Sequence, residues 1–333
     1  MLSALRRYLP DPFVLALLAT VALASVLPCQ GAAAKVFGVL TLAAIALLFF
    51  MHGVRLPREA VVAGIGHWRL HLMILGCTFV FFPLLGLLLS HLFPHLLPQP
   101  VWLGVLFVCA LPSTVQSSIA FTSIARGNVP AAVVAATASN LAGIAVTPVL
   151  IGVLLSLHGG GVGWDQVWKI VLELLAPFAA GHLLRPWLAG WAARHRRLTT
   201  LSDRGSILLT VYTSFSAAVV QGIWSQVPLT SLLVLTGVLA VILAVVLAAT
   251  TWGARLMGFS REDEIAIVFC GSKKSLASGV PMANVLFAGP AVGLTVLPLM
   301  IFHQMQLMVC AALARRYAAT APPETLSAPP IEG

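Results

Sequence analysis

Charged residues are scarce in this 333-residue sequence. Asp, Glu, Lys and Arg make up 9% of it, against about 25% in an ordinary soluble domain. Apolar residues reach 59%, and the mean hydropathy is +1.00. A soluble fold of this size has too little polar surface to cover so many apolar residues. The composition excludes a soluble enzyme, a disordered protein and a nucleic-acid binder, and it predicts an all-α protein embedded in a lipid bilayer.

The common catalytic and metal-binding motifs are also absent. The five cysteines form no CxxC or Cys/His cluster, which excludes a disulfide framework and a zinc site. The sequence has no Walker A motif, no GxGxxG after a strand and no HExxH. No pair of acidic residues lies inside an apolar run. We therefore expect no enzyme activity, no cofactor and no metal site. An intramembrane enzyme using Ser117 or Ser275 with a lysine as base is the most distant alternative.

Long apolar runs dominate what is present. A membrane-spanning helix needs about 20 predominantly apolar residues. That window predicts ten spans, at 12–28, 33–51, 68–90, 100–124, 129–156, 166–185, 204–221, 228–254, 263–286 and 290–313. Residues 1–11 precede the first span, and residues 314–333 form a Pro- and Ala-rich tail that we expect to be disordered.

The basic residues test this topology. Fifteen of the 19 Lys and Arg residues fall on the side that holds both termini, and only Lys35 and Lys169 fall on the other side. Cytoplasmic segments carry an excess of Lys and Arg. The sequence thus predicts cytoplasmic termini and, for a bacterial protein, the inner membrane.

Ten spans divide into two sets of five, 12–156 and 166–313. Because five is odd, the second set enters the membrane from the opposite side, which is the inverted-repeat plan of many secondary transporters. Both sets have an interrupted fourth span and a fifth span with an internal proline, Pro148 or Pro298.

Two polar segments interrupt the apolar pattern at membrane depth. The first runs from Leu111 to Ser118 and contains Pro112 and the candidate site residues Gln116, Ser117 and Ser118. The second runs from Cys270 to Pro281 and contains the candidates Ser272, Lys273, Lys274 and Ser275. Irregular backbone within a bilayer is tolerated where it lines a cavity or is buried in protein. Matching interruptions in two halves indicate a transporter binding site.

The adjacent lysines indicate the ligand. A lysine at the centre of a helix costs about 2.5–3.5 kcal/mol on insertion scales and is usually functional. We expect at least one of Lys273 and Lys274 to face a central cavity and attract a small organic anion. The sequence leaves open which one, and whether the other is neutral or paired with helix-end carbonyl groups.

Three further polar residues are candidates for lining the same cavity. Asn140 either contacts the ligand or bridges two helices, and we assign the neighbouring Thr137 to packing. His303 either carries a proton or forms a helix-to-helix hydrogen bond, and Gln304 stands beside it.

These segments resemble a known family. The strings at 112–118, 124–129 and 147–150 resemble the fourth and fifth helices of the bile acid:sodium symporter family, and the string Gly271–Gly279 is similar to its SBF-like subgroup. The resemblance covers nearly the whole chain. It implies a panel of helices 1, 2, 6 and 7, a core of the other six, and unwound fourth and ninth helices that cross. It also implies transport of organic anions, typically with sodium.

The sequence differs from sodium-coupled members at the ninth-helix break. Those members carry Glu and Gln there, whereas Lys273 and Lys274 occupy this stretch. Ammonium groups repel Na⁺ and can replace its charge, so we expect no sodium coupling. The first hypothesis is a secondary transporter or facilitator of an organic anion, working by alternating access. The alternative is a regulator of ion homeostasis that keeps the transporter fold. The sequence does not specify an oligomeric state.

Overall fold

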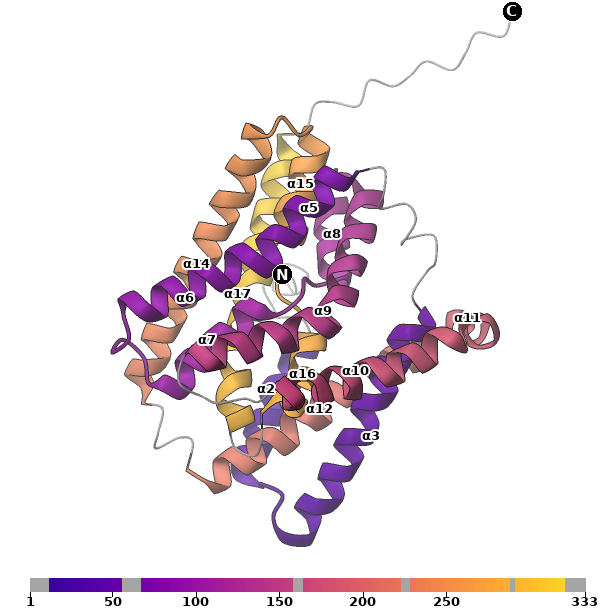
Figure 1. The fold of residues 1–333 in the computed structure, drawn as a ribbon, viewed down its shortest axis with the longest axis vertical. Helices are drawn as coiled ribbons and strands as arrows, with labels where there is room; N and C mark the ends of the chain where they lie inside the picture. The colour runs from indigo at the N-terminus through magenta and orange to yellow at the C-terminus, as the bar shows by residue number, and fades with distance from the viewer. Residues whose placement is uncertain (1–11, 56–66, 158–163, 223–227, 288–290, 321–333) are drawn as a thin grey trace, which may run out of the picture.

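The computed structural model describes residues 12–55, 67–157, 164–222, 228–287 and 291–320, and within these ranges all regular structure is helical (Figure 1). In chain order the helices are α2 (Pro12–Val26), α3 (Gly31–Arg55), α5 (Trp68–Gly76), the π-helix η1 (Cys77–Phe81), α6 (Phe82–Leu92), α7 (Gln99–Ala110), α8 (Gln116–Ile124), α9 (Val129–Leu157), α10 (Trp164–Leu183), α11 (Arg185–Arg194), α12 (Arg196–Val220), α14 (Leu229–Leu256), α15 (Arg261–Gly271), α16 (Leu276–Leu286) and α17 (Ala291–Ala319).

Several helices are long and apolar enough to cross a membrane. Within the described residues, five helical stretches meet both criteria, at Gly31–Arg55, Trp68–Leu92, Val129–Leu154, Leu229–Leu256 and Val292–Ala319. Shorter apolar helices cover Leu15–Val26, Gln99–Ala110 and Val171–Leu183. Every one of the ten predicted spans coincides with one helix or with consecutive helical segments.

Both predicted interruptions are present, and both are short. Helix α7 ends at Ala110 because Leu111, the residue before Pro112, is extended with a ψ of 154°. Helix α8 begins at Gln116. Residues 272–275 separate α15 from α16, and Ser275 caps α16 by accepting a hydrogen bond from the backbone N–H of Ser278. The polar residues that follow each break thus belong to the first turn of a new helix.

The π-helix η1 widens one turn between α5 and α6. The N–H of Phe82 bonds to the carbonyl of Cys77, five residues back. The next residue, Pro83, has no N–H and cannot continue the ladder. The carbonyl of Thr78 therefore loses the donor that an uninterrupted π-turn would supply.

The helices form two packed groups. In the first group α3 packs against α10 and α12, and α2 packs against α12; in the second, α5 to α9 pack with α14 to α17. Within the first group Gly53 of α3 and Gly181 of α10 bring the two backbones together, because a Cβ atom on either would overlap the opposite main chain. Contacts of α9 with α10, and of α12 with α16 and α17, join the two groups.

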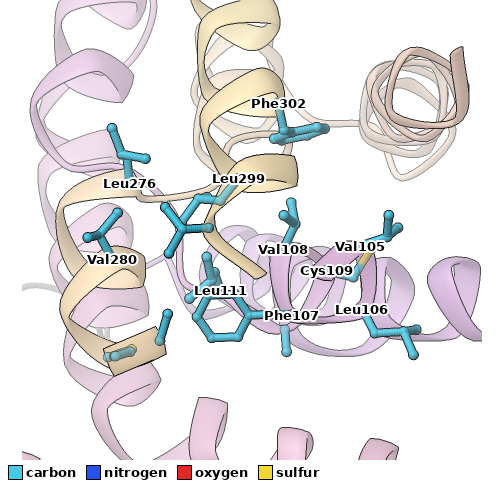
Figure 2. Close-up of a cluster of buried hydrophobic side chains, with 14 of the residues drawn as sticks. Val105, Leu106, Phe107, Val108, Cys109, Leu111, Leu276, Val280, Leu299 and Phe302 are labelled. Carbon is cyan, nitrogen blue, oxygen red and sulfur yellow. The ribbon is translucent and has the colours of Figure 1, made fainter. Parts of the chain in front are cut away.

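An apolar cluster packs α7 against α16 and α17 (Figure 2). Leu111 faces Leu276, Val280 and Leu299 in this cluster. A Cβ atom on Gly279 would approach Leu111 Cδ1 to 2.5 Å and Leu299 Cδ2 to 2.7 Å, so a larger residue there would require both leucine side chains to shift. The broken helices are thus held by close apolar packing as well as by polar contacts.

The structure corrects three boundaries from the sequence. Helix α17 continues to Ala319, so residues 314–319 are helical; Arg261 donates to the carbonyl groups of Tyr317 and Thr320 and caps this extension. The short helix α11 was not predicted. Helix α12 begins at Arg196, eight residues before the predicted span. The predicted N-terminal segment 1–11 and the tail from 321 onward lie outside the described residues.

Candidate functional site at the helix crossing

The two breaks lie against each other at the centre of the core. The N–H of Ser275 donates to the carbonyl of Pro112 at 2.9 Å, and the hydroxyl of Ser113 donates to the carbonyl of Cys270 at 2.6 Å. A Cβ atom on Gly143 of α9 would lie 2.7 Å from the Pro112 ring, so α9 packs directly on the first break. The expected crossing of two discontinuous helices is therefore present.

Lys274 satisfies three carbonyl groups at this crossing. Its ammonium group is fully buried and donates to Cys109 O at 2.8 Å, Leu111 O at 2.7 Å and Thr78 O at 2.8 Å. The first two acceptors are at the C-terminal end of α7, where carbonyl groups lack helical donors and the helix dipole favours a cation. The third is the carbonyl that Pro83 leaves without a donor. All three N–H donors of the ammonium group are thus used.

At the C-terminal end of α15, serine hydroxyl groups donate to the carbonyl groups that lack helical donors. The hydroxyl of Ser118 donates to Phe269 O at 2.9 Å, and that of Ser113 donates to Cys270 O. Ser272 bonds back to Val268 O within its own turn. Each broken helix therefore has its C-terminal carbonyl groups capped by side chains of the other.

Lys273 has a different environment from its neighbour. Its side chain is also fully buried, but its ammonium group donates to Ser117 Oγ over 3.4 Å. The Phe121 ring centroid lies 4.4 Å from Nζ and the Phe269 centroid lies 5.6 Å away. Aromatic faces attract a cation at such distances.

Gln306 fixes the backbone of the second break. Its Oε1 accepts from the N–H of Lys274 and its Nε2 donates to the carbonyl of Lys274, both at 2.8 Å. The same Nε2 lies 3.0 Å from His303 Nδ1. With the amide orientation fixed, Nδ1 is the acceptor, and His303 carries its ring proton on Nε2.

A large cavity reaches the crossing between the two helix groups. Its volume is about 990 Å³. Both α8 and α16 contribute their N-terminal residues to the wall, and the rest comes from α2, α3, α9, α10, α12, α17 and the break before α8. The polar residues of the wall are His52, Arg55, Thr114, Gln116, Ser117, Thr137, Asn140, Thr200, Asp203, Arg204, Ser275, Ser278, His303, Gln304 and Arg315.

At the crossing the cavity wall carries oriented polar groups. Ser278 donates its hydroxyl proton to Asn140 Oδ1 at 2.7 Å. Because Oδ1 is engaged, Asn140 has its Nδ2 donor group left for the cavity that it lines. The N-terminal turns of α8 and α16 lie beside it, and helix N-termini carry partial positive charge.

The far part of the cavity wall is basic. Arg55, Arg204 and Arg315 line it together with a single carboxylate, Asp203. Arg55 engages that carboxylate with two hydrogen bonds of 2.8 and 2.7 Å. Positive charge therefore exceeds negative charge along this wall.

A second cavity of about 590 Å³ lies farther along the same helices. Thr200 to Ile207 of α12 line the first cavity, and residues from Thr213 to Gln221 line the second. Helix α16 also lines both cavities: its first residues line the first cavity, and Asn284 and Phe287 near its end line the second. The buried Thr210 and Val211 lie on α12 between the two.

Six of the ten predicted site residues line the first cavity, namely Gln116, Ser117, Asn140, Ser275, His303 and Gln304. The other four, Ser118, Ser272, Lys273 and Lys274, are buried at the crossing and do not line it. The expectation that one lysine faces the cavity therefore differs from the structure, because Ser117 and Phe121 lie between Lys273 and the cavity. Thr137, assigned to packing, lines the cavity.

Several residues of the site had no distinguishing signal in the sequence. Arg55, Arg204 and Arg315 read as ordinary cytoplasmic charges, and Phe121 as one apolar residue of a span. Thr114 and Ser278 lay within the polar segments and could have been included with them. Gln306 lies on the same span as His303 and Gln304, and the sequence does not distinguish it from them.

The comparisons agree with this architecture. The model of the SBF-like CPA transporter family matches residues 11–319. Protein PA2026 of Pseudomonas aeruginosa is 59% identical over 313 residues, 94% of each chain. "Putative symporter YfeH" of Escherichia coli is 54% identical over 307 residues, 92% of each chain. "Sodium/bile acid cotransporter 7" of Rattus norvegicus is 28% identical over 274 residues, 81% of this chain and 80% of the relative. The resemblance found in the sequence is confirmed: this integral membrane protein belongs to the SBF-like CPA transporter family, a family of transporters and not of enzymes.

Proposed function

We propose that the chain is a secondary transporter or facilitator of a small organic anion. The observation that carries this proposal is the charge of the first cavity. Two helix N-termini and the Asn140 amide contribute to its wall, which also carries three arginines and a single carboxylate, Asp203, already engaged by Arg55. Both features favour an anion. The name of the rat relative, a sodium/bile acid cotransporter, supports the same substrate class.

The fold supports an arrangement of ten membrane spans in two inverted repeats, 12–156 and 166–313. Such a repeat pairs α2 with α10 and α3 with α12, so a contact of α3 with α10 requires one of α2 with α12. Both contacts exist. Likewise α7 packs on α17, and α15 packs on α9. Paired contacts of this kind are expected when two halves share one fold in opposite orientations.

Movement of one helix group against the other would give alternating access. Two cavities share α12 and α16, and a buried layer around Thr210 and Val211 separates them. Beside this layer, in the wall of the second cavity, a 3.2 Å hydrogen bond from Asn284 Nδ2 to Ser214 Oγ joins α16 to α12. Opening that layer while the first cavity closes would carry a bound anion across the membrane.

We further propose that transport needs no sodium ion. Three carbonyl oxygens converge on the Lys274 ammonium group, at the crossing where the family resemblance implies cation coupling. A covalently attached cation in that position supplies the charge and the hydrogen bonds permanently. An additional Na⁺ would meet electrostatic repulsion and find these oxygens occupied.

The arginine-lined wall faces the cytoplasm in this proposal. The exposed residues Arg194, Arg196 and Arg197 lie where α11 ends and α12 begins, and Trp187 and Trp191 are exposed on α11. Basic residues mark the cytoplasmic side, and tryptophan is enriched at the interface. Both termini are then cytoplasmic, and the bacterial relatives support an inner-membrane location.

Counterflow in proteoliposomes tests these proposals together. Purified protein is reconstituted with an unlabelled anion inside, and uptake of the labelled anion is measured for taurocholate and for small carboxylates. We expect uptake of at least one anion, inhibited in Arg204→Gln and Arg315→Gln, and equal with Na⁺ or K⁺. Absence of counterflow for every anion would overturn anion transport, and uptake that requires a sodium gradient would overturn sodium independence.

A further inference from the structure

The two adjacent lysines have unequal sets of partners. Lys274 directs its three N–H groups to three carbonyl oxygens. In the described part of the chain, the Lys273 ammonium donates one hydrogen bond to an oxygen, Ser117 Oγ, over 3.4 Å. Its other neighbours include the faces of Phe121 and Phe269. Lys274 is therefore saturated, whereas Lys273 keeps donor capacity.

The barrier between Lys273 and the first cavity is one side chain thick. Ser117 and Phe121, the two α8 residues in contact with the ammonium group, both line the cavity. The Phe269 ring is tilted relative to that of Phe121, and the two ring centroids lie 5.9 Å apart. Rotation of the Phe121 ring away from Nζ would thus bring the ammonium group into contact with the cavity.

The hydrogen bonds among Ser117, Thr114 and Ser118 determine which group can donate to a ligand. Ser118 donates its only hydroxyl proton to Phe269 O, so Thr114 must donate to Ser118 across their 2.8 Å contact. Ser117 in turn donates to Thr114 Oγ1. Its proton is committed, so Ser117 accepts from Lys273 and does not itself offer a donor to the cavity.

We propose that Lys273 is the anion-binding lysine of this transporter, and that Phe121 is the side chain an anionic ligand displaces to reach it. The inference rests on the proposed function and names the group that binds the carboxylate or sulfonate. A charge-assisted hydrogen bond to an anionic oxygen replaces the weak contact with the ring. Lys274 stays in its carbonyl cage and takes no part in binding.

Reductive labelling with glyoxylate, an anionic aldehyde, tests this assignment. A lysine amine condenses with the aldehyde and loses water, and cyanoborohydride reduces the imine to carboxymethyl-lysine, which peptide mass spectrometry locates. The chain has four lysines, and the exposed Lys35 is the reference for intrinsic reactivity. We expect labelling at Lys273 and none at Lys274. Propanal, a neutral aldehyde of similar size, should label Lys273 more slowly relative to Lys35.

Variants of Phe121 provide the matched controls. Phe121→Leu removes the aromatic face, and labelling of Lys273 should become about fivefold faster, the factor expected for the loss of one cation–π contact. Phe121→Trp strengthens the aromatic barrier and should slow labelling, so one variant remains informative if the other does not fold. Equal labelling of both lysines, or a Lys273 rate unchanged in both variants, would overturn the proposal. Because labelling does not depend on transport, this result and the counterflow result can fail independently.

Discussion

The ammonium group of Lys274 and the carbonyl group of Leu111 are joined by a 2.7 Å hydrogen bond, although 163 residues separate them in the chain. This bond closes the end of α7 with a side chain from the break between α15 and α16. The reciprocal contact, from Ser113 to Cys270 O, closes the end of α15. The polar chemistry of the crossing is thus first a set of caps for two interrupted helices, and several predictions about stability and ligand binding depend on it.

Replacement of Lys274 by Met should severely destabilise the protein. Met keeps the apolar stem but removes three donors, and each buried carbonyl left without a partner costs about 1–3 kcal/mol. We expect K274M to unfold at a much lower temperature in detergent, or to fail to fold. Lys273→Met is the control, because removing a weakly paired buried charge is often neutral. Equal losses in the two variants would contradict the assignment of Lys274 to the carbonyl cage.

Gln306 should contribute much more to the stability of the protein than Gln304. Gln306→Leu leaves the buried N–H and C=O of Lys274 unpaired, and we expect a loss of about 2–4 kcal/mol in the free energy of unfolding. Gln304→Leu should cost little stability, because Gln304 Oε1 is buried with no hydrogen-bond partner in the described residues. Chemical denaturation in mild detergent gives both values. The reverse order of the two losses would show that the Gln306 contacts are weak.

Two helical glycines should respond oppositely to alanine. A Cβ atom on Gly143 would lie 2.7 Å from the rigid Pro112 ring, so G143A should destabilise by about 1–3 kcal/mol through overpacking. Gly237 of α14 has no atom within 4 Å of a Cβ position, and G237A should stabilise by about 0.5–1 kcal/mol. Thermal unfolding of both variants checks the prediction. A G143A protein as stable as the parent would mean that the break can move away from α9.

The Arg55–Asp203 ion pair should limit the positive charge available to an anion. Asp203→Asn removes the single carboxylate on the cavity wall and releases the Arg55 guanidinium group. We expect a lower half-saturation concentration for counterflow of the transported anion, with a steeper dependence on salt. Arg55→Gln should act in the opposite direction. Weaker binding in D203N would instead indicate that Asp203 itself contacts the ligand.

Cysteine labelling should establish the orientation in the membrane. Cys29 is half-buried in the second cavity, and Arg196 is exposed at the start of α12. In intact bacteria a membrane-impermeant maleimide should label Cys29. In a protein that carries Cys29→Ser together with Arg196→Cys, labelling should require permeabilised cells. Labelling of the Arg196→Cys protein from outside would reverse the proposed topology.

Much of the fold could be predicted from the sequence because bilayer insertion leaves clear signals. Apolar length located the long helices, and Pro112 located the first break because the residue before proline avoids the helical region. The second break is shorter than the predicted segment from Cys270 to Pro281. Only residues 272–275 are irregular, and Pro281 lies inside α16. Proline is tolerated there within a buried helix, and its position therefore did not mark a boundary.

The site was harder to predict than the fold. Adjacent residues in an irregular segment can point in unrelated directions, so the different environments of Lys273 and Lys274 depend on coordinates and not on spacing. The arginines of the cavity wall carry the same signal as any cytoplasmic arginine. Helix α11 is only ten residues long and its apolar residues do not gather on one face, so the proline near its start, Pro186, was its main signal in the sequence.

The caps exchanged between the two breaks also constrain biosynthesis. When residues 99–124 have entered the membrane, the lysine that closes the end of α7 has not yet been translated. The carbonyl groups of Cys109 and Leu111 then bond to water or to transient partners until the ribosome has reached Lys274, which is more than 160 residues beyond them in the chain. The first half of the chain therefore cannot complete its central irregular turn alone, and a fragment ending before α15 should be a substrate for quality-control proteases.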